Sequence, residues 1–324
     1  MGYNRENYRR IKHEYEGKNL RAKEEAIKRA EELYKKIPEL EMIDESIKDI
    51  GMKLFAEATK GKEGFEERAA QIRKENLEAV AFRNECLKIN KYPADYTNVK
   101  YECNDCSDTG YIGIDMCSCM KKALIIAGYE SSGVGSLIKT QSFETFNLNF
   151  YNDKPEWRNE MEDNLNLFKG YAENFKSGNG DNLLLLGPTG LGKTHISTSI
   201  AKVVIESGFD VVYDTAQNMF GDFEYERFNR SYQDTGEDRT LKYFECDLLI
   251  IDDLGTEVNN QFTVATLYNI INTRINNKKS IIINTNLTRD ELRKKYADRI
   301  ASRLFGEFSP RMFYGKDVRE LKLK

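Results

Sequence analysis

The sequence predicts an α/β fold in which helices cover both faces of a parallel β-sheet, preceded by an all-α arm and a small cysteine-rich segment. Three observations support this prediction. Short apolar runs alternate with helical patterns after residue 183, as in parallel sheets whose faces are both covered. A glycine-rich loop joins the first of these runs to a helix. The first hundred residues are compatible with helix almost throughout, and four closely spaced cysteines follow them.

Length and composition limit the classes to which the protein can belong. A chain of 324 residues is long for a single core and suggests two or three units. The net charge is only −4 although 31% of the residues are charged, so any contact with nucleic acid must come from a local patch. We find neither a signal-peptide pattern nor an apolar run of about 18 residues, and we therefore expect a cytoplasmic protein without membrane contact. Cysteines in that compartment are more often thiols or metal ligands than disulfides.

Residues 1–97 are predicted to form a helical arm. Its charges nearly cancel, because residues 1–100 contain 22 Lys and Arg and 20 Asp and Glu. Pro38 separates two helices, since proline suits a first turn and pushes the preceding residue out of the helical region. A third helix is predicted at about 66–89. The arm is either a solvated spacer or a docking surface, and narrow apolar stripes on charged helices favour docking. The stripes are Ala26, Ala30 and Leu33, and then Ile43, Ile47, Ile50 and Leu54.

Residues 98–125 contain a cysteine cluster with the spacing C-x₂-C, ten residues, C-x-C. Two close pairs separated by a hairpin-sized loop can place four sulfurs around Zn²⁺ and leave no open position for chemistry. We therefore predict a structural zinc site that supplies the folding free energy of a segment too short for its own core. An iron–sulfur cluster and unligated thiols are the alternatives. Cys86 and Cys246 lie outside this spacing and are interpreted as packing residues. The predicted ligands are Cys103, Cys106, Cys117 and Cys119.

Residues 126–142 are predicted to be a linker. The stretch 131–136 contains three serines and two glycines, a composition typical of flexible segments, so we place a hinge there. Beyond residue 143 the chain becomes richer in aromatic and apolar residues. A helix around Trp157, the only tryptophan, leads to the first predicted strand.

The strongest functional signal is the loop that follows the apolar run Leu183–Leu186. It matches the pattern G-x-x-x-x-G-K-[ST] and precedes a predicted helix. Its backbone N–H groups can converge on phosphate oxygens, Lys193 can reach the β- and γ-phosphates, and the Thr194 hydroxyl can ligate Mg²⁺. The positive end of the helix dipole favours the same anion. We therefore predict a nucleoside triphosphate site formed by Gly187, Pro188, Thr189, Gly190, Leu191, Gly192, Lys193, Thr194 and His195.

An acidic pair ends the strand predicted at 248–253. Asp252 is expected to lie across from Thr194 and to hold Mg²⁺ through water, while Asp253 is expected to orient the water that attacks the γ-phosphate. Capping of a loop is the alternative role for this pair. Between the glycine-rich loop and this strand, the pattern predicts a strand at 209–213 and a helix at 218–230. The aromatic stripe of that helix, interpreted as core, is Phe220, Phe223 and Phe228.

The last part of the chain supplies a further strand and a basic segment. The strand predicted at 280–286 ends in Asn286, which can polarise the attacking water or touch the γ-phosphate, with Thr285 as a support. Residues 287–324 hold 11 Lys and Arg against 6 Asp and Glu. Arg299 and Arg303 are four residues apart on one helix face. A planar guanidinium there suits insertion into a neighbouring subunit's nucleotide site, and a surface ion pair is the alternative role.

The order of these motifs resembles that of AAA+ ATPases of the DnaC/DnaI helicase-loader branch. The likeness covers about residues 100–324, and the cysteine segment is similar to the zinc segment of Gram-positive and phage loaders. It implies an AAA+ domain at 143–324, with ATP and Mg²⁺ as ligands. It also implies that Arg303 is the arginine finger and that Arg319 is the second sensor arginine of its own subunit. The segments that carry the likeness are 187–194, Ile250–Gly255, Asn284–Leu287, Arg299–Leu304 and Gly315–Arg319, together with Cys103–Tyr111 and Cys117–Cys119.

Two features depart from that family pattern, and a third bears on DNA contact. Asp253 stands where many AAA+ proteins carry Glu, so hydrolysis is expected to be slow or to need a partner. Only 138 residues run from Gly187 to Lys324, so we expect the helical lid to be reduced or absent. In this family the helix after the second strand can face single-stranded DNA. Residues 223–239 carry five acids and three bases, which leaves a direct DNA contact open.

The resemblance implies an ATP-dependent loader that delivers the replicative helicase hexamer onto single-stranded DNA, with the helicase bound through the arm. ATP binding would assemble the subunits through AAA+ interfaces, and hydrolysis would release them. Two alternatives remain. A transposition helper of the IstB type shares the ATPase core, and a non-enzymatic adaptor would use ATP only as an assembly switch.

Overall fold

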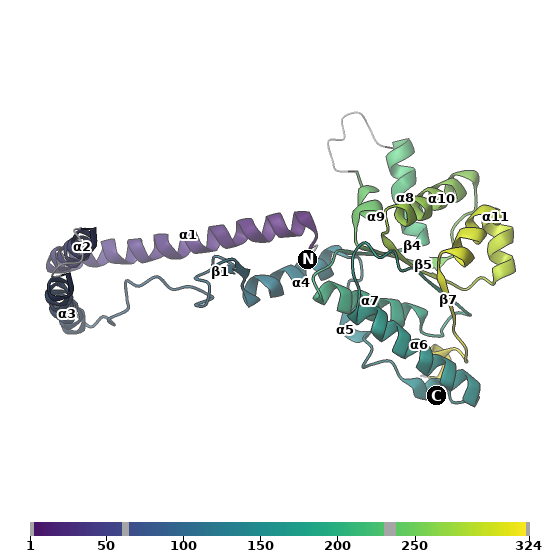
Figure 1. The fold of residues 1–324 in the computed structure, drawn as a ribbon, viewed down its shortest axis with the longest axis horizontal. Coiled ribbons are helices and arrows are strands. Elements are labelled where there is room, and N and C mark those ends of the chain that lie inside the picture. Colours follow the sequence, from purple (N-terminus) through teal and green to yellow (C-terminus); the bar gives the residue numbers. More distant parts are fainter. Residues whose placement is uncertain (1–2, 60–64, 230–237, 322–324) are drawn as a thin grey trace. The chain divides into compact units, whose positions relative to one another are not determined.

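The computed structural model describes residues 3–59, 65–229 and 238–321. The chain divides into two units (Figure 1). We call residues 12–117 the helical unit, and residues 1–11 together with 118–324 the sheet unit. The first eleven residues, predicted to belong to the arm, are therefore part of the sheet unit.

The helical unit contains the three predicted helices. They are α1 (Arg5–Lys36), which begins in the sheet unit, α2 (Pro38–Thr59) and α3 (Phe65–Ile89). Pro38 opens α2 as expected, and its neighbour Ile37 packs with Leu33, Leu40 and Leu87 in a small buried cluster. An ion pair of 2.5 Å between Arg83 and Asp44 ties α3 to α2. None of the helices in the described ranges is long and apolar enough to cross a bilayer.

The sheet unit is built on five parallel strands in the order β4-β5-β6-β3-β7. This arrangement confirms the predicted α/β fold class. The strand before the glycine-rich loop, β3, lies between β6 and β7, so β6 separates it from the strand that carries the acidic pair. The strands are β3 (Leu183–Leu186), β4 (Val211–Thr215), β5 (Leu248–Leu254), β6 (Ser280–Thr285) and β7 (Ser309–Met312).

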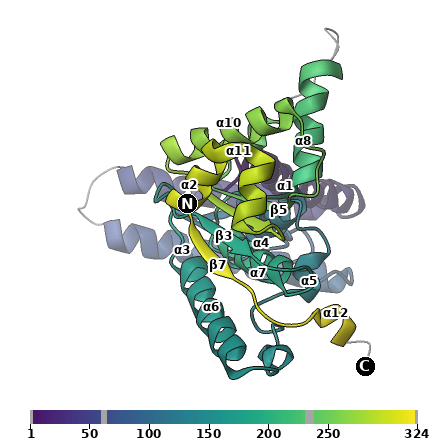
Figure 2. The same ribbon diagram turned by 90° about the vertical axis from the view of Figure 1, so that its right-hand side faces the viewer.

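Helices cover both faces of this sheet (Figures 1 and 2). On one face α6 (Pro155–Glu173) and α7 (Lys193–Glu206) bury a continuous apolar core, and on the other face α8 (Ala216–Glu224), α10 (Gln261–Asn276) and α11 (Arg289–Gly306) bury a second one. The helix predicted at 218–230 begins two residues earlier, because the Thr215 side chain accepts from the Asn218 amide and caps it. Its last predicted residue, Arg230, lies outside the described residues. The remaining elements are β1 (Tyr111–Ile112), β2 (Asp115–Met116), α4 (Ser118–Ser131), α5 (Leu137–Thr140), η1 (Leu148–Tyr151), η2 (Tyr225–Asn229), α9 (Leu241–Glu245) and α12 (Val318–Leu321).

The segment predicted as a hinge, 131–136, is packed into the sheet unit instead. Val134 and Ile138 belong to the core on the α7 face, and the Tyr213 amide donates to the Ser132 carbonyl at 2.6 Å. Gly133 has a φ of 80°, and a Cβ there would lie 2.2 Å from the Tyr213 carbonyl oxygen. The glycines in this stretch therefore permit a close approach to β4, where composition alone suggested flexibility.

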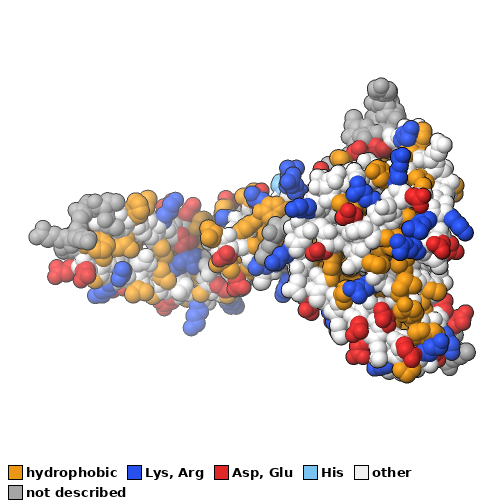
Figure 3. All heavy atoms as spheres, turned by 45° about the vertical axis from the view of Figure 1, so that its right-hand side comes forward, with side chains coloured by type: hydrophobic (Ala, Val, Ile, Leu, Met, Phe, Trp, Pro, Cys, Tyr) orange, Lys and Arg blue, Asp and Glu red, His pale blue; other side chains and the backbone are white. Residues whose placement is uncertain are grey.

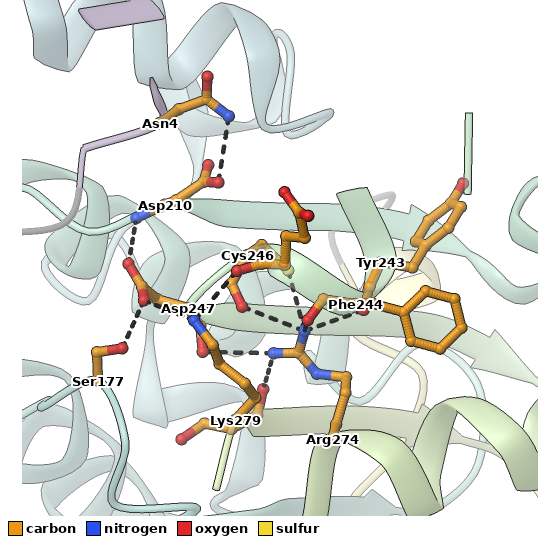
Figure 4. Close-up of polar contacts among 11 residues, drawn as sticks. Asn4, Ser177, Asp210, Tyr243, Phe244, Cys246, Asp247, Arg274 and Lys279 are labelled. Atoms are coloured by element: carbon orange, nitrogen blue, oxygen red, sulfur yellow. Dashed lines mark hydrogen bonds and ion pairs between the residues drawn. The ribbon is translucent and has the colours of Figure 1, made fainter. Parts of the chain in front are cut away.

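A buried polar cluster ties together the amino-terminal ends of β4 and β5 (Figure 4). Arg274, fully buried at the end of α10, donates to backbone carbonyls around β5 and β6, among them Tyr243 at 2.9 Å and Ser280 at 2.7 Å. Asp247 accepts from Ser177 at 2.5 Å and from the Asp210 amide at 3.1 Å. Asp210 in turn accepts from the Asn4 side chain at 3.1 Å, which anchors the residues before α1 to β4.

Candidate functional site

The glycine-rich loop occupies the turn between β3 and α7. Gly187, Gly190 and Gly192 all have positive φ values, of 145°, 76° and 88°. A Cβ at Gly187 would lie 2.6 Å from the Phe313 carbonyl oxygen, and a Cβ at Gly190 would lie 2.0 Å from an Asp317 carboxylate oxygen. Glycine is therefore required both by the loop conformation and by the chain that packs against it.

Lys193 opens α7 and points back over the loop. Its side chain is buried, and its Nζ donates to the carbonyls of Gly187 at 2.6 Å and Pro188 at 2.7 Å. Burial lowers the pKa of the Lys193 ammonium, while the nearby carboxylates of Asp253 and Asp252 oppose that shift. A lysine held at the mouth of such a loop is placed to meet phosphate oxygens.

Thr194 and Asp252 are brought together as predicted. The Thr194 hydroxyl donates to Asp252 Oδ2 at 2.9 Å, although the two residues lie on α7 and β5. A hydroxyl and a carboxylate are hard oxygen ligands, which Mg²⁺ prefers. We call this pair the magnesium corner, and its donor set fits the metal.

Asp253 lies beside the magnesium corner in a strained conformation. It has a φ of 53°, and the pairing of β5 with β6 slips between Ile251 and Leu254. Such an irregularity at the end of a strand re-aims a side chain, and strain of this kind gathers at functional sites. The pKa of the Asp253 carboxyl is raised, because desolvation and the neighbouring Asp252 charge outweigh the opposing charges of Lys193 and Arg319.

Two partners of Asp252 were not predicted. The Tyr213 hydroxyl of β4 donates to Asp252 Oδ2, and the Asn284 side chain of β6 donates to Asp252 Oδ1 at 2.8 Å and to Ser197 at 2.9 Å. The available signal was a polar residue within each apolar run. Asn284 was part of the motif, but the sequence favoured Asn286 for a functional role.

Thr285 and Asn286 lie at the carboxyl end of β6, the same end of the sheet as the acidic pair of β5. Asn286 comes directly after β6 and is exposed. Thr285 is fully buried, and its hydroxyl donates to the Leu254 carbonyl at 2.6 Å, so it holds the ends of β5 and β6 together. The contact of Asn286 with the γ-phosphate stays a prediction.

The far side of the loop is closed by residues 142–151. His195 Nε2 lies 2.8 Å from the Ser142 carbonyl oxygen and 3.1 Å from Thr145 Oγ1, so its ring faces this wall. Leu191 is buried and accepts from the Tyr151 hydroxyl at 2.9 Å, whereas Pro188 and Thr189 are exposed at the tip of the loop. The wall includes Phe146, which packs edge-on against His195.

The three candidate arginines lie in different surroundings. Arg319 is exposed on α12, close enough to affect the charge state of both Lys193 and Asp253. Val318 next to it donates its amide to the Gly190 carbonyl at 3.0 Å, which fixes this segment on the loop. Arg303, on α11, contacts Asn272 at 3.0 Å and Glu307 at 3.8 Å, and Arg299 is exposed. The finger role of Arg303 stays a prediction.

The four predicted cysteine ligands form one cluster. Their sulfurs all lie within 4.8 Å of one another, and those of Cys103 and Cys117 are 3.9 Å apart. Tetrahedral zinc with Zn–S bonds of about 2.3 Å requires sulfurs roughly 3.8 Å apart, so the cluster fits zinc. None of these four cysteines forms a disulfide.

Asp108 organises this cluster, a role that the sequence did not reveal. Its buried carboxylate accepts from the amides of Glu102 at 2.9 Å and Cys103 at 2.8 Å. The Cys117 amide donates to the Gly110 carbonyl at 2.8 Å and closes the hairpin of β1 and β2. The only available signal was the C-x-x-C-S-D-T-G run itself.

Comparisons with known proteins agree with this site. Residues 171–304 match the family model described as IstB-like ATP binding protein. The chromosomal replication initiator protein DnaA of Aliarcobacter butzleri is 33% identical over 124 residues, covering 37% of this chain and 26% of that protein. The chain thus spans about a quarter of the length of the curated relatives that it matches.

Two solved structures are also similar. The crystal structure of the DnaC helicase loader gives a TM-score of 0.43 at 23% identity and covers 53% of this chain and 98% of its own. The crystal structure of DnaI gives 0.45 at 18% identity and covers 56% of this chain and 92% of its own. The family match falls on the part of the sheet unit that carries the glycine-rich loop and the acidic pair, so this part of the chain is similar to IstB-like ATP binding proteins.

Proposed function

We propose that this protein is an ATP-dependent loader that delivers a replicative helicase hexamer onto single-stranded DNA. The observation that carries the ATP-dependent part is the joint placement of Lys193, Thr194 and Asp252 around one loop. The identity with DnaA, a replication initiator by its name, supports a place in DNA replication. The nucleotide site lies in the sheet unit, and the helical unit supplies a separate surface for the helicase.

In this proposal the residues of the sheet unit divide the work of ATP hydrolysis. Bound ATP supplies the phosphoanhydride bond, and Mg²⁺ neutralises its phosphate charge. The loop amides and Lys193 hold the phosphates, and the magnesium corner holds the metal. Asp253 orients the attacking water, and its short side chain makes turnover slow. The remaining roles are sensing by Asn286, contact with the γ-phosphate in the same subunit by Arg319, and transition-state stabilisation in the neighbouring subunit by Arg303.

ATP binding by the full chain tests the nucleotide site. Lys193→Ala should abolish tight ATP binding while the protein stays folded, because this lysine acts on phosphate. Lys139→Ala, at an exposed position of α5, is the matched control and should bind normally. Unchanged affinity in the Lys193 variant would refute the site. Steady-state hydrolysis with and without DNA and helicase then separates a loader from an adaptor that only binds ATP.

The helical unit offers apolar side chains to a partner. Met42 on α2 and Phe82 on α3 are 72% and 61% exposed, and both lie within two residues of the Asp44–Arg83 ion pair. Figure 3 shows hydrophobic side chains among charged ones on the surface of this unit. Exposed apolar groups of this size support a docking surface for another protein.

Helicase capture tests this docking surface. Met42→Glu and Phe82→Glu in the full chain should weaken co-purification with the replicative hexamer of the same cell or phage, since a charge is costly in an apolar interface. Leu241→Glu, on the sheet unit and 49% exposed, is the control and should not. Undiminished capture by both variants would exclude this face.

A cluster of aromatic and basic residues supports contact with single-stranded DNA. The Arg227 guanidinium lies 5.2 Å from the ring centre of Phe228 and 5.1 Å from that of Phe262, and Phe228 is 66% exposed. Exposed rings paired with arginine suit base stacking and backbone contact. Phe220, predicted as core, is buried, so the aromatic stripe divides between core and surface.

The alternative function is that of an IstB-like transposition helper, which the family match favours. Both functions need the ATPase domain, so hydrolysis cannot separate them. Co-purification can. A loader should retain the replicative helicase, whereas capture of a transposase, with the helicase ignored, would overturn the loader proposal and leave the ATPase assignment intact.

A further inference from the structure

The Asp252 carboxylate is held from four sides. Oδ2 accepts from the hydroxyls of Thr194 and Tyr213, while Oδ1 accepts from the Asn284 amide group at 2.8 Å and from the Asp253 backbone N–H at 3.0 Å. Asp252 is only 5% exposed. Each oxygen thus accepts two hydrogen bonds, which fixes the plane of the carboxylate.

Tyr213 reaches this carboxylate from the neighbouring strand. It pairs with Ile250 of β5, and Asp252 lies two residues further on the same face of the sheet. Its hydroxyl donates to Oδ2, the same oxygen that accepts from Thr194. A residue that is not part of the magnesium corner therefore helps to hold Oδ2 beside the Thr194 hydroxyl. The tyrosine is itself buried.

The backbone of Tyr213 is fixed as firmly as its side chain. Tyr213 lies on β4, an edge strand, and its N–H is occupied by the Ser132 carbonyl at 2.6 Å. The glycine at 133 lets this turn approach so closely that a Cβ would clash with the Tyr213 carbonyl oxygen. A fixed backbone under a hydrogen-bonded hydroxyl is the arrangement expected of a group that orients a metal ligand.

We propose that Tyr213 is a positioning residue for magnesium, acting through Asp252. This inference rests on the proposed binding of ATP with Mg²⁺. Tyr213 does not touch the metal or the nucleotide. Its hydroxyl holds Asp252 Oδ2 toward the Thr194 hydroxyl, so that the oxygens that meet the hydrated metal are in place before it arrives. Removing the hydroxyl leaves Asp252 its charge but takes away one of the two donors that hold Oδ2.

The full chain with Tyr213→Phe tests this role, because only the hydroxyl is lost. Binding of a fluorescent ATP analogue is measured at rising Mg²⁺ and, separately, in EDTA. We expect the Mg²⁺ concentration for half-maximal binding to rise about tenfold, the low end for loss of a residue that orients a metal ligand. Affinity in EDTA should match that of the wild type, and high Mg²⁺ should restore binding.

Tyr243→Phe is the matched control. Tyr243 is fully buried in the same unit, and its hydroxyl also donates to carboxylates, those of Asp214 and Asp222. It belongs to the core on the opposite face of the sheet from Tyr213. It should show the wild-type Mg²⁺ dependence even where its thermal stability falls.

Two results would overturn the positioning role. One is an unchanged Mg²⁺ midpoint for Tyr213→Phe, and the other is an equal loss of affinity with and without metal, which would indicate a purely structural residue. A wild-type protein that binds no ATP under either condition would instead refute the proposed function, and the inference with it.

Discussion

Arg274 places a guanidinium where no water reaches it. Its two terminal nitrogens donate to the carbonyls of five residues and to the Cys246 sulfur, and no part of the side chain is exposed. Those carbonyls lie in α9, in the two residues that lead from α9 into β5, and at the first residue of β6. Backbone carbonyls buried in such places need a hydrogen-bond donor. A single side chain therefore satisfies the backbone at the amino-terminal side of the sheet, opposite the nucleotide site.

Removing this side chain should destabilise the sheet unit without touching ATP binding. Arg274→Ala leaves several buried acceptors unpaired, each worth about 1–3 kcal/mol, so we expect a loss of at least about 3 kcal/mol. Fluorescence of Trp157, the only tryptophan, follows unfolding of this unit in denaturant. Arg289→Ala, which loses only a cation–π contact with Phe305, should change stability by about 1 kcal/mol or less. A loss below that control would show that water can replace Arg274.

Asp210 should make stability depend on pH. Burial, with the nearby Asp247 charge, raises the pKa of the Asp210 carboxyl in the folded protein. The folded state therefore binds this proton more tightly than the unfolded state, and stability falls as pH rises from about 4 through the folded pKa. Asp210→Asn keeps an acceptor for Asn4 but cannot ionise, so its stability relative to wild type should increase over that interval. Asp163→Asn, at an exposed position of α6, controls for the lost charge. A constant difference across this pH range would contradict the argument.

At the scale of elements, strands that are apolar runs were predictable and strands that are not were missed. The apolar runs of β3, β5 and β6 predict buried strands in a sheet whose two faces are covered by helices. The edge strand β7 has the sequence Ser-Pro-Arg-Met and no apolar run. Proline is tolerated there because an edge strand leaves one side unpaired. β7 is a strand because it pairs with β3, and its own four residues do not reveal that pairing.

The same distinction applies within the site. The glycine-rich loop, Thr194 and Asp252 were predictable, because phosphate and magnesium chemistry requires these residue types at fixed spacing. Tyr213 and Asn284 were not, since any residue that reaches Asp252 with a donor could serve. Their role depends on the order of strands in the sheet, which brings β4, β5 and β6 side by side.

The cysteine cluster gives a prediction at this scale. Native mass spectrometry should find about one zinc per chain, and the double variant Cys103→Ser, Cys106→Ser should lose it, because a closed four-thiolate site cannot spare one pair. Cys86→Ser, outside the cluster, should keep the metal. ATP affinity should be nearly unchanged, since the cysteines are not part of the loop. Zinc retained by the double variant, or iron in place of zinc, would refute the assignment.

At the scale of the whole molecule, the proposed finger role of Arg303 predicts that one chain is not a complete enzyme. Arg319 is placed to affect Lys193 and Asp253 within its own chain, whereas Arg303 on α11 contacts Asn272 on α10 and Glu307 at the end of its own helix. If Arg303 serves as a finger, it must leave these partners and act on the nucleotide of a neighbouring subunit. Assembly and hydrolysis would then be coupled, because each site is completed by another copy of the chain.

Mixing two inactive variants tests this coupling. Arg303→Ala should still bind ATP but hydrolyse it about 10³ to 10⁵ times more slowly, the usual worth of an arginine finger. Lys193→Ala should not bind ATP but keeps its finger. In a 1:1 mixture, random assembly places an intact finger beside an ATP-binding site at roughly one position in four, so part of the activity should return. Arg319→Ala is the sharp control. Its defect lies in the subunit that binds ATP, and mixing with Lys193→Ala should restore nothing. Failure of the Arg303 mixture to recover, while the variants still co-assemble, would remove the finger role from Arg303 and direct the same test to Arg299.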